Sequence, residues 1–270
     1  MNQVTEPKSS GPLSDVLVML APYGNERQST AHFVSVLQSL GVTVLKAQAK
    51  AEVSLTRCVL AAAGYDALRQ CPHLNWVFWL DQDVSGDMFA VQNLIQFATA
   101  LRLDIYPSVS GVYVNRHTKP PRVAAAAVRR MDPLQVSIGT HDGATAVGEC
   151  VPALCGLGCL LQHRTTFMQH CDESEHFAFP NRDTIVPEVC TSHRIHSSDF
   201  GRFMPLPEGE DIHYWCSEDF DYCIREFEHG RLVFTVPVHF GHECDYVLWP
   251  DGNCVYPGLR PPNGKQAEAG

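Results

Sequence analysis

The chain has 270 residues, of which 45% are hydrophobic and 19% are charged. This composition is ordinary for a globular protein and excludes a collagen-like, coiled-coil or largely disordered chain. The 30 acidic and 20 basic residues give a formal net charge of −10. A protein that binds nucleic acid through its overall electrostatic field should be basic, so nucleic-acid-binding proteins are disfavoured as a class. An acidic protein that binds a phosphate-bearing ligand would need a cation to mediate the contact.

Eleven cysteines are many for this length, and none of them forms a CxxC pair. Residues 1–14 are polar, and the first apolar run is too short and too late for a signal peptide. No stretch reaches the roughly 20 apolar residues of a membrane span. We therefore expect reduced thiols in the core of a cytoplasmic protein with no membrane span.

Strand and helix signals alternate through the first half of the chain. The expected elements are a strand at 16–21, a helix at 28–40, a strand at 42–45, a helix at 54–70, a strand at 75–80 and a helix at 87–101. This βαβαβα order predicts a mixed, mostly parallel sheet with helices on both faces. Ligands of such sheets bind beyond the carboxyl ends of the strands.

The second half carries weaker and more mixed signals. The expected elements are strands at 108–115, 123–128 and 147–154, a short helix at 165–170, a helix at 217–228 and a strand at 232–236. Residues 172–213 are polar, hold four of the thirteen histidines and show no clean periodicity. We expect an irregular loop there.

Two carboxylates follow the most apolar strand signal, because Trp76–Leu80 runs directly into Asp81-Gln82-Asp83. Hard cations such as Mg²⁺ or Mn²⁺ take oxygen ligands, commonly one or two carboxylates together with substrate phosphates. The motif therefore predicts a divalent cation site. The alternative reading is an acidic, solvated turn.

Glu218 and Asp219 open the helix expected from Ser217. Acids in a first turn complement the helix dipole, and Ser217 is a suitable N-cap, so a capping role is the common reading. The functional reading is that Asp219 faces a site as a general base.

His239 and His242 lie late in the chain, just after a β-branched strand signal. A neutral imidazole can complete a cation site that carboxylates begin. The alternative for each ring is a histidine with satisfied hydrogen bonds and no ligand.

A group of cysteines and histidines lies between residues 163 and 196, comprising His163, His170, Cys171, His176, Cys190, His193 and His196. These residue types bind Zn²⁺, although the spacing fits no standard zinc finger. Upstream, Gly156-Leu157-Gly158 lacks the pattern of a phosphate-binding loop, and it predicts a close approach of the backbone to a bound ligand.

Taken in order, these segments resemble a GT-A-fold glycosyltransferase, which uses nucleotide sugars. The similar stretches are Val16–Gly24, Ser54–Arg57, Trp76–Val84 with the DxD motif, Ser110–Tyr113, Cys155–Leu161, Ser217–Cys223 and Val238–His242. Cys58 departs from the pattern, because such enzymes carry an Arg-Asn pair where this chain has Arg57-Cys58.

The resemblance implies a single GT-A-like, Rossmann-like domain over residues 15–250, between flexible tails at 1–14 and 251–270. Residues 15–115 would form its nucleotide-binding half. Residues 116–250 would form the acceptor-side half, with 172–213 as an acceptor-specific loop.

The resemblance also implies a function, the transfer of a sugar from a nucleoside diphosphate sugar to an acceptor hydroxyl with Mn²⁺ or Mg²⁺. In it, Asp81, Asp83 and His242 bind the metal, and Asp219 is the base with Glu218 beside it. The implied donor contacts are Pro22, Tyr23, Arg57, Asp81 and Gly156. A glycan, a protein or a modified nucleic-acid base is each compatible as acceptor.

Two other functions stay open at this point. A nucleotidyltransferase acting on a sugar phosphate also combines an α/β sheet with carboxylates, but it would carry a Gly-rich basic loop after the first strand, where residues 21–26 hold one glycine and an acid. A zinc-stabilised, non-enzymatic binding module could be built on the 163–196 group.

Overall fold

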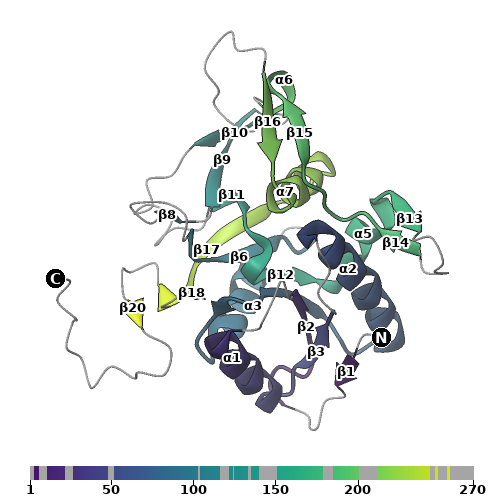
Figure 1. The fold of residues 1–270 in the computed structure, drawn as a ribbon, viewed down its shortest axis with the longest axis vertical. Helices are drawn as coiled ribbons and strands as arrows, with labels where there is room; N and C mark the ends of the chain where they lie inside the picture. The colour runs from purple at the N-terminus through teal and green to yellow at the C-terminus, as the bar shows by residue number, and fades with distance from the viewer. Residues whose placement is uncertain are drawn as a thin grey trace.

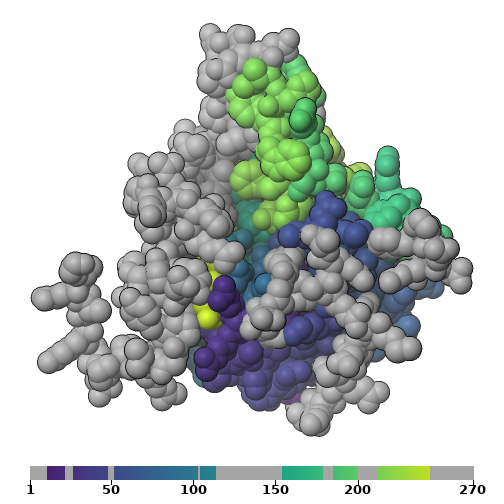
Figure 2. Space-filling model, in the orientation of Figure 1, coloured from purple at the N-terminus to yellow at the C-terminus, as the bar shows by residue number. Residues whose placement is uncertain are grey.

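A mixed ten-stranded β-sheet forms the centre of the computed structural model (Figure 1). The structure describes residues 3–5, 11–21, 27–47, 52–102, 104–115, 122–123, 125–132, 135–139, 151–178, 185–200, 212–243, 247–248 and 254–255. In the space-filling view, the first part of the chain (purple to blue) lies below the green segment that follows residue 212 (Figure 2).

The first half folds in the βαβαβα order predicted from the sequence. Its elements are β2 (Val16–Ala21), α1 (Gln28–Ser39), β3 (Thr43–Lys46), α2 (Val53–Gln70), β4 (Trp76–Asp81) and α3 (Ala90–Ala100). Strand β2 lies between β3 and β4 and is parallel to both, so the ends of β2 and β4 meet where Ala21 faces Asp81.

The central six strands are mostly parallel. Beyond β4 come β12 (Leu160–His163), β6 (Ser108–Val112) and β17 (Val233–His239). Strand β12 is antiparallel to both β4 and β6, while β17 is parallel to β6. Five of the six strands therefore share one direction, and their carboxyl ends lie along one edge, where an open α/β sheet binds its ligands.

Further strands extend the sheet at both ends with antiparallel pairing. Strand β1 (Gln3–Thr5) pairs with β3 at one end. Strands β11 (Val151–Cys155), β9 (Ala125–Asp132) and β10 (Gln135–Gly139) follow β17 at the other.

Helices cover both faces of the sheet, because the apolar side chains of each strand point alternately to the two faces. In β2, Leu17 and Met19 pack into one core cluster with α2, α5 (Arg164–Glu173) and α7 (Glu218–Glu228). Val16 and Val18 pack into the other cluster, with α1 and α3. Successive side chains of a strand point to opposite faces, so a wholly apolar strand is one that is buried on both sides.

The segment 172–213 is more regular than its composition indicated. It contains the hairpin of β13 (His176–Ala178) and β14 (Ile185–Pro187), the strand β15 (His193–His196) and the short helix α6 (Ser197–Phe200). Strand β15 pairs with β16 (His213–Cys216). These strands of three or four residues are too short to produce a readable period.

Other boundaries also differ from the expectations. The strand expected at 108–115 is divided into β6 and β7 (Val114–Asn115), and β7 pairs with β8 (Arg122–Val123). A short 3₁₀ helix, η1 (Leu157–Cys159), leads into β12. These breaks place Tyr113 and Gly156 between elements rather than inside them.

Parts of the two expected tails are ordered. Besides β1, Leu13 is buried and its amide donates to the carbonyl oxygen of Leu40 over 3.0 Å. Near the other end, β20 (Cys254–Val255) joins a sheet with β19 (Val247–Leu248), β18 (Gly241–Glu243) and β5 (Val84–Ser85). This small sheet connects the last part of the chain to the loop after β4.

The eight cysteines in the described part of the chain are free thiols, and seven of them are buried. This agrees with the expected reduced core. Among the helices within the described ranges, none combines the length and the apolar character needed to cross a bilayer.

Candidate active site

Arg57 lies in the first turns of α2 with its side chain buried. Its Nη2 atom donates to both carboxylate oxygens of Asp81 at the end of β4, over 3.1 and 3.2 Å. Helix α2 packs on the face of β2, next to β4, and this packing aims Arg57 at the carboxyl edge of the sheet. The predicted donor ligand Arg57 thus binds a carboxylate of its own chain.

The same guanidinium holds the start of α7. Its Nη1 atom donates to Glu218 over 3.2 Å and also makes a close contact with Asp219 Oδ1. Ser217 is the N-cap and accepts the amide of Phe220 over 3.5 Å, so the capping reading is confirmed. The capped helix start presents its acids to Arg57, and one guanidinium faces three carboxylates, which leaves an excess of negative charge.

The Asp219 carboxyl is suited to accept a proton. Burial raises its pKa above the ordinary value; the Arg57 charge opposes this shift, and the charge of Asp81 adds to it. The Leu157 amide donates to Oδ1 over 3.2 Å. Within the described ranges both hydrogen bonds to this carboxyl reach Oδ1, and a quarter of the side chain is exposed. Oδ2 is therefore the oxygen that can take a proton.

Asp83 and His242 form a second pair. Strand β18 pairs with β5, and the Glu243 amide donates to the Asp83 carbonyl oxygen over 2.7 Å. This pairing sets His242 Nε2 at 3.4 Å from Asp83 Oδ2. Glu243 in turn accepts the Ser29 amide of α1 over 3.0 Å, which ties the pair to the rest of the fold.

Tyr113, just beyond β6, contacts His242 and lies against Gly156, the residue before the Leu157 amide that bonds Asp219. Its ring meets the His242 ring edge-on, with centroids 5.4 Å apart. Burial raises the pKa of Tyr113 well above its ordinary value, and the charges of Asp219 and then Asp81 raise it further. The phenol therefore lies within the field of the Arg57 group while it touches the Asp83–His242 pair.

Two glycines allow these side chains to approach the backbone. A Cβ on Gly156 would overlap the Tyr113 hydroxyl, and a Cβ on Gly158 would lie 2.8 Å from Asp81 Oδ2. The sequence predicted that this stretch approaches a bound ligand. Within the structure the close approaches are to Tyr113 and Asp81.

The predicted site residues separate into two groups. Arg57, Asp81, Glu218 and Asp219 meet in one cluster, while Asp83 and His242 pair beside it. No three His, Cys, Asp or Glu side chains in the described ranges are placed to hold a metal ion together, so Asp81 does not complete a ready three-ligand site with Asp83 and His242. Pro22 and Tyr23 lie outside the described residues.

Sequence reasoning missed three contributors: Tyr113, the Leu157 amide and Ser192, whose hydroxyl donates to Glu218 over 3.0 Å. Tyr113 carried a usable signal, because it ends an apolar strand signal and so falls at the same edge as Asp81. The other two contacts join segments far apart in the sequence and have no local pattern.

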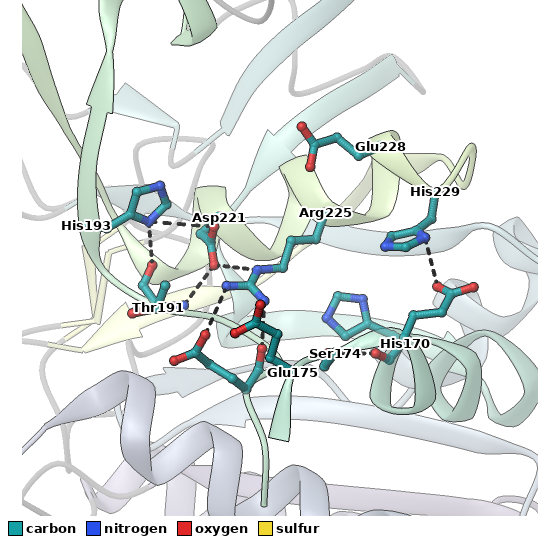
Figure 3. Close-up of a pocket in the computed structure, with 11 residues that line it drawn as sticks. His170, Ser174, Glu175, Thr191, His193, Asp221, Arg225, Glu228 and His229 are labelled. Carbon is teal, nitrogen blue, oxygen red and sulfur yellow. Dashed lines mark hydrogen bonds and ion pairs between the residues drawn. The ribbon is translucent and has the colours of Figure 1, made fainter. Parts of the chain in front are cut away.

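A pocket of about 460 Å³ opens elsewhere, between the end of α5, α7 and residues 188–193 (Figure 3). Most of the charged side chains around it form ion pairs or hydrogen bonds with other charged side chains. Arg225 donates to Asp221 over 2.9 Å, and Glu173 accepts from Arg231 over 2.5 Å and pairs with His229 at 3.2 Å. Since Asp221 lies two residues after Asp219 on a helix, the two side chains leave α7 in different directions. The residues that line the pocket do not include Arg57, Asp81, Asp219 or His242 of the candidate site.

The residues of the expected zinc group serve in different contacts. His170 bonds Glu226 through Nδ1 over 2.6 Å and the Val189 carbonyl oxygen through Nε2 over 2.8 Å. The Cys190 carbonyl accepts from Cys58, and His193 lies 3.7 Å from Asp221.

Comparison with known proteins supports the fold alone. No family model matches the chain, and neither does any curated protein sequence. Among solved structures, the chain is similar to the crystal structure of A197 from STIV, with a TM-score of 0.51 and 15% sequence identity. The match covers 93% of this chain and 98% of that chain. The likeness supports a mixed α/β fold with a mostly parallel central sheet.

Proposed function

We propose that this protein is a metal-dependent glycosyltransferase that moves a sugar from a nucleoside diphosphate sugar to an acceptor hydroxyl. One observation carries the proposal. At the carboxyl edge of the sheet, Arg57 bridges Asp219, a carboxyl of raised pKa, to Asp81, two residues before the Asp83 that pairs with His242. A proton acceptor beside a candidate cation site is the combination that this reaction needs.

The Asp83–His242 pair fits part of the coordination shell of Mn²⁺ or Mg²⁺. Adjacent ligands at about 2.1 Å from an octahedral cation lie about 3 Å apart, and the facing atoms of this pair are 3.4 Å apart. Such cations are commonly held by one or two protein ligands together with substrate phosphates. A cation bound here would neutralise the charge that develops on a departing diphosphate.

The protein's own residues would position and deprotonate the acceptor. Arg57 and the Leu157 amide hold Oδ1 of Asp219, which fixes the carboxyl while Oδ2 takes the proton of the acceptor hydroxyl. Asp81, held by Arg57, would contact the donor ribose or the metal. Pro22, Tyr23 and Gly156 complete the proposed donor contacts. The glycan, protein or nucleic-acid base that accepts the sugar is identified by none of these contacts.

The test is a thermal-shift panel of nucleoside diphosphates, each with and without Mn²⁺. We expect one nucleotide to raise the melting temperature only together with Mn²⁺, because the protein supplies an incomplete cation site. At 100 times Kd the ligand should add about 2.7 kcal/mol to the free energy of unfolding.

Asp83→Ala should abolish that stabilisation and the metal-dependent transfer, and it should leave the unliganded fold intact. Its carbonyl still accepts the Glu243 amide, which preserves the β5–β18 pairing. Asp66→Asn, at an exposed position of α2, is the control and should respond as the wild type does. If a nucleotide raises the melting temperature equally with and without Mn²⁺, or still raises it in Asp83→Ala, the result would count against the proposal.

A further inference from the structure

Tyr113 is buried, with 7% of the residue exposed. Its hydroxyl makes no hydrogen bond with any residue in the described ranges. Buried tyrosine hydroxyls normally have a partner, because an unmatched polar group loses its bond to water. The Tyr113 hydroxyl oxygen is not itself fully buried, so a ligand that enters the site can supply the acceptor that no described residue provides.

The surroundings of this hydroxyl restrict the kind of ligand. It lies against the backbone of Gly156, the ring contacts His242, and the charges of Asp219 and Asp81 act on the phenol. A second anion next to two carboxylates would be repelled. A neutral oxygen, such as a sugar hydroxyl, fits this environment better than a phosphate.

The position within the proposed reaction leads to the same ligand. The carbon that is attacked must lie between the acceptor oxygen, at Asp219, and the diphosphate, at Asp83 and His242. The transferred sugar therefore occupies the space between these two groups. Tyr113 contacts His242 and lies against Gly156, next to the Leu157 amide that holds Asp219.

We infer that the Tyr113 hydroxyl donates a hydrogen bond to a hydroxyl oxygen of the transferred sugar, and that it helps to select and orient that sugar. This inference rests on the proposed function. Gly156 is needed for this hydrogen bond, because any larger residue at that position would displace the Tyr113 hydroxyl.

Calorimetry on wild type and Tyr113→Phe tests the inference. The probes are a nucleoside diphosphate that stabilises the wild type, such as UDP or GDP, and its common sugar conjugates, all with Mn²⁺. Loss of one neutral hydrogen bond should weaken sugar-nucleotide binding about three- to tenfold, and it should leave the Kd of the nucleoside diphosphate unchanged. Phenylalanine keeps the ring contact with His242.

Tyr65→Phe is the matched control, because the Tyr65 hydroxyl donates to Asp172 over 2.7 Å on the exposed surface of α2. Tyr65→Phe should change neither the Kd of the sugar conjugate nor the Kd of the nucleoside diphosphate. If Tyr113→Phe binds the sugar conjugate as tightly as the wild type, or weakens conjugate and nucleoside diphosphate equally, the inference is wrong while the proposed function stands. If the wild type binds no nucleotide, both fail.

Donors with single deoxy positions in the sugar give a second measurement that needs no variant. One deoxy donor should bind the wild type about three- to tenfold more weakly than its parent. The same deoxy donor and its parent should bind Tyr113→Phe equally. If every deoxy donor binds the wild type as its parent does, the sugar makes no such hydrogen bond and the inference is overturned.

Discussion

Arg57 shows how much the role of one residue depends on its neighbours. The sequence indicated a donor ligand, whereas the structure surrounds its guanidinium with Asp81, Glu218 and Asp219. Removing one partner of a buried ion pair typically costs about 3–5 kcal/mol, because it leaves the other charge uncompensated. Arg57 is therefore the residue that allows three acids to share one edge of the sheet.

Asp219→Asn is the prediction at the scale of the residue. The amide keeps the shape of the side chain and cannot take a proton, so turnover should fall about 100-fold or more, with the Kd of the donor nearly unchanged. In the wild type the rate should rise with pH through a pKa above the ordinary 3.8 of an aspartate, because the base must be deprotonated. Steady-state kinetics across pH provide the check.

Asp66→Asn is the matched control for that experiment and should keep the wild-type pH profile. A variant at Asp219 with normal turnover and weak donor binding would show that this carboxyl binds the donor instead of acting as the base.

At the scale of the element, α7 owes its position to buried polar groups. Glu226 accepts from His170 over 2.6 Å and from Arg231 over 2.9 Å, and it has Ser108 of β6 at 3.4 Å. One turn earlier, Tyr222 donates to Gln162 of β12 over 2.6 Å. These bonds fix the direction of α7. They therefore also fix the position of Glu218 and Asp219 at the start of the helix, about 12 Å along its axis from Glu226.

Glu226 gives the prediction for α7. Burial by itself would raise the pKa of Glu226, but His170 and then Arg231 outweigh it and hold the pKa below the ordinary 4.5. A depressed carboxyl pKa stabilises the fold above the unfolded value, and this contribution is lost as pH falls through the folded value. The free energy of unfolding of the wild type should therefore decrease below pH 4.5.

Glu226→Gln should lower stability at pH 7 by about 3 kcal/mol, because the buried Arg231 guanidinium loses its carboxylate and His170 loses the acceptor of its hydrogen bond. It should also flatten the acid limb of the stability curve, which urea unfolding at several pH values will measure. Glu228→Gln, at an exposed position of the same helix, should change stability by less than about 0.5 kcal/mol. An unchanged acid limb in Glu226→Gln would contradict the role given to this carboxylate.

At the scale of the whole molecule, the site joins segments from most of the chain. Arg57, Asp81 and Tyr113 come from the first half, while Asp219 and His242 come from the second. Strand β18 reaches the loop after β4 by pairing with β5. A ligand bound across this edge therefore contacts several elements at once.

Hydrogen exchange tests that arrangement. With Mn²⁺ and a stabilising nucleotide at 100 times Kd, amides should exchange up to about 100-fold more slowly in three segments together, 81–85, 155–159 and 241–243. Exchange in β13 (His176–Ala178), which lies in a separate hairpin, serves as the internal control and should not change. Protection limited to one of the three segments would show that the ligand does not bridge the two halves.

The sequence by itself determined the alternating elements, because apolar runs such as Val16–Ala21 must be buried on both sides. It also located the acids at 81, 83, 218 and 219 at the ends of elements, where carboxylates can remain near solvent. Tertiary structure alone decided which of these acids meet. Arg57 lies over 160 residues from Asp219, and β18 meets β5 across about as long a stretch of chain. Such contacts arise from packing and strand pairing, which leave no local pattern in the chain.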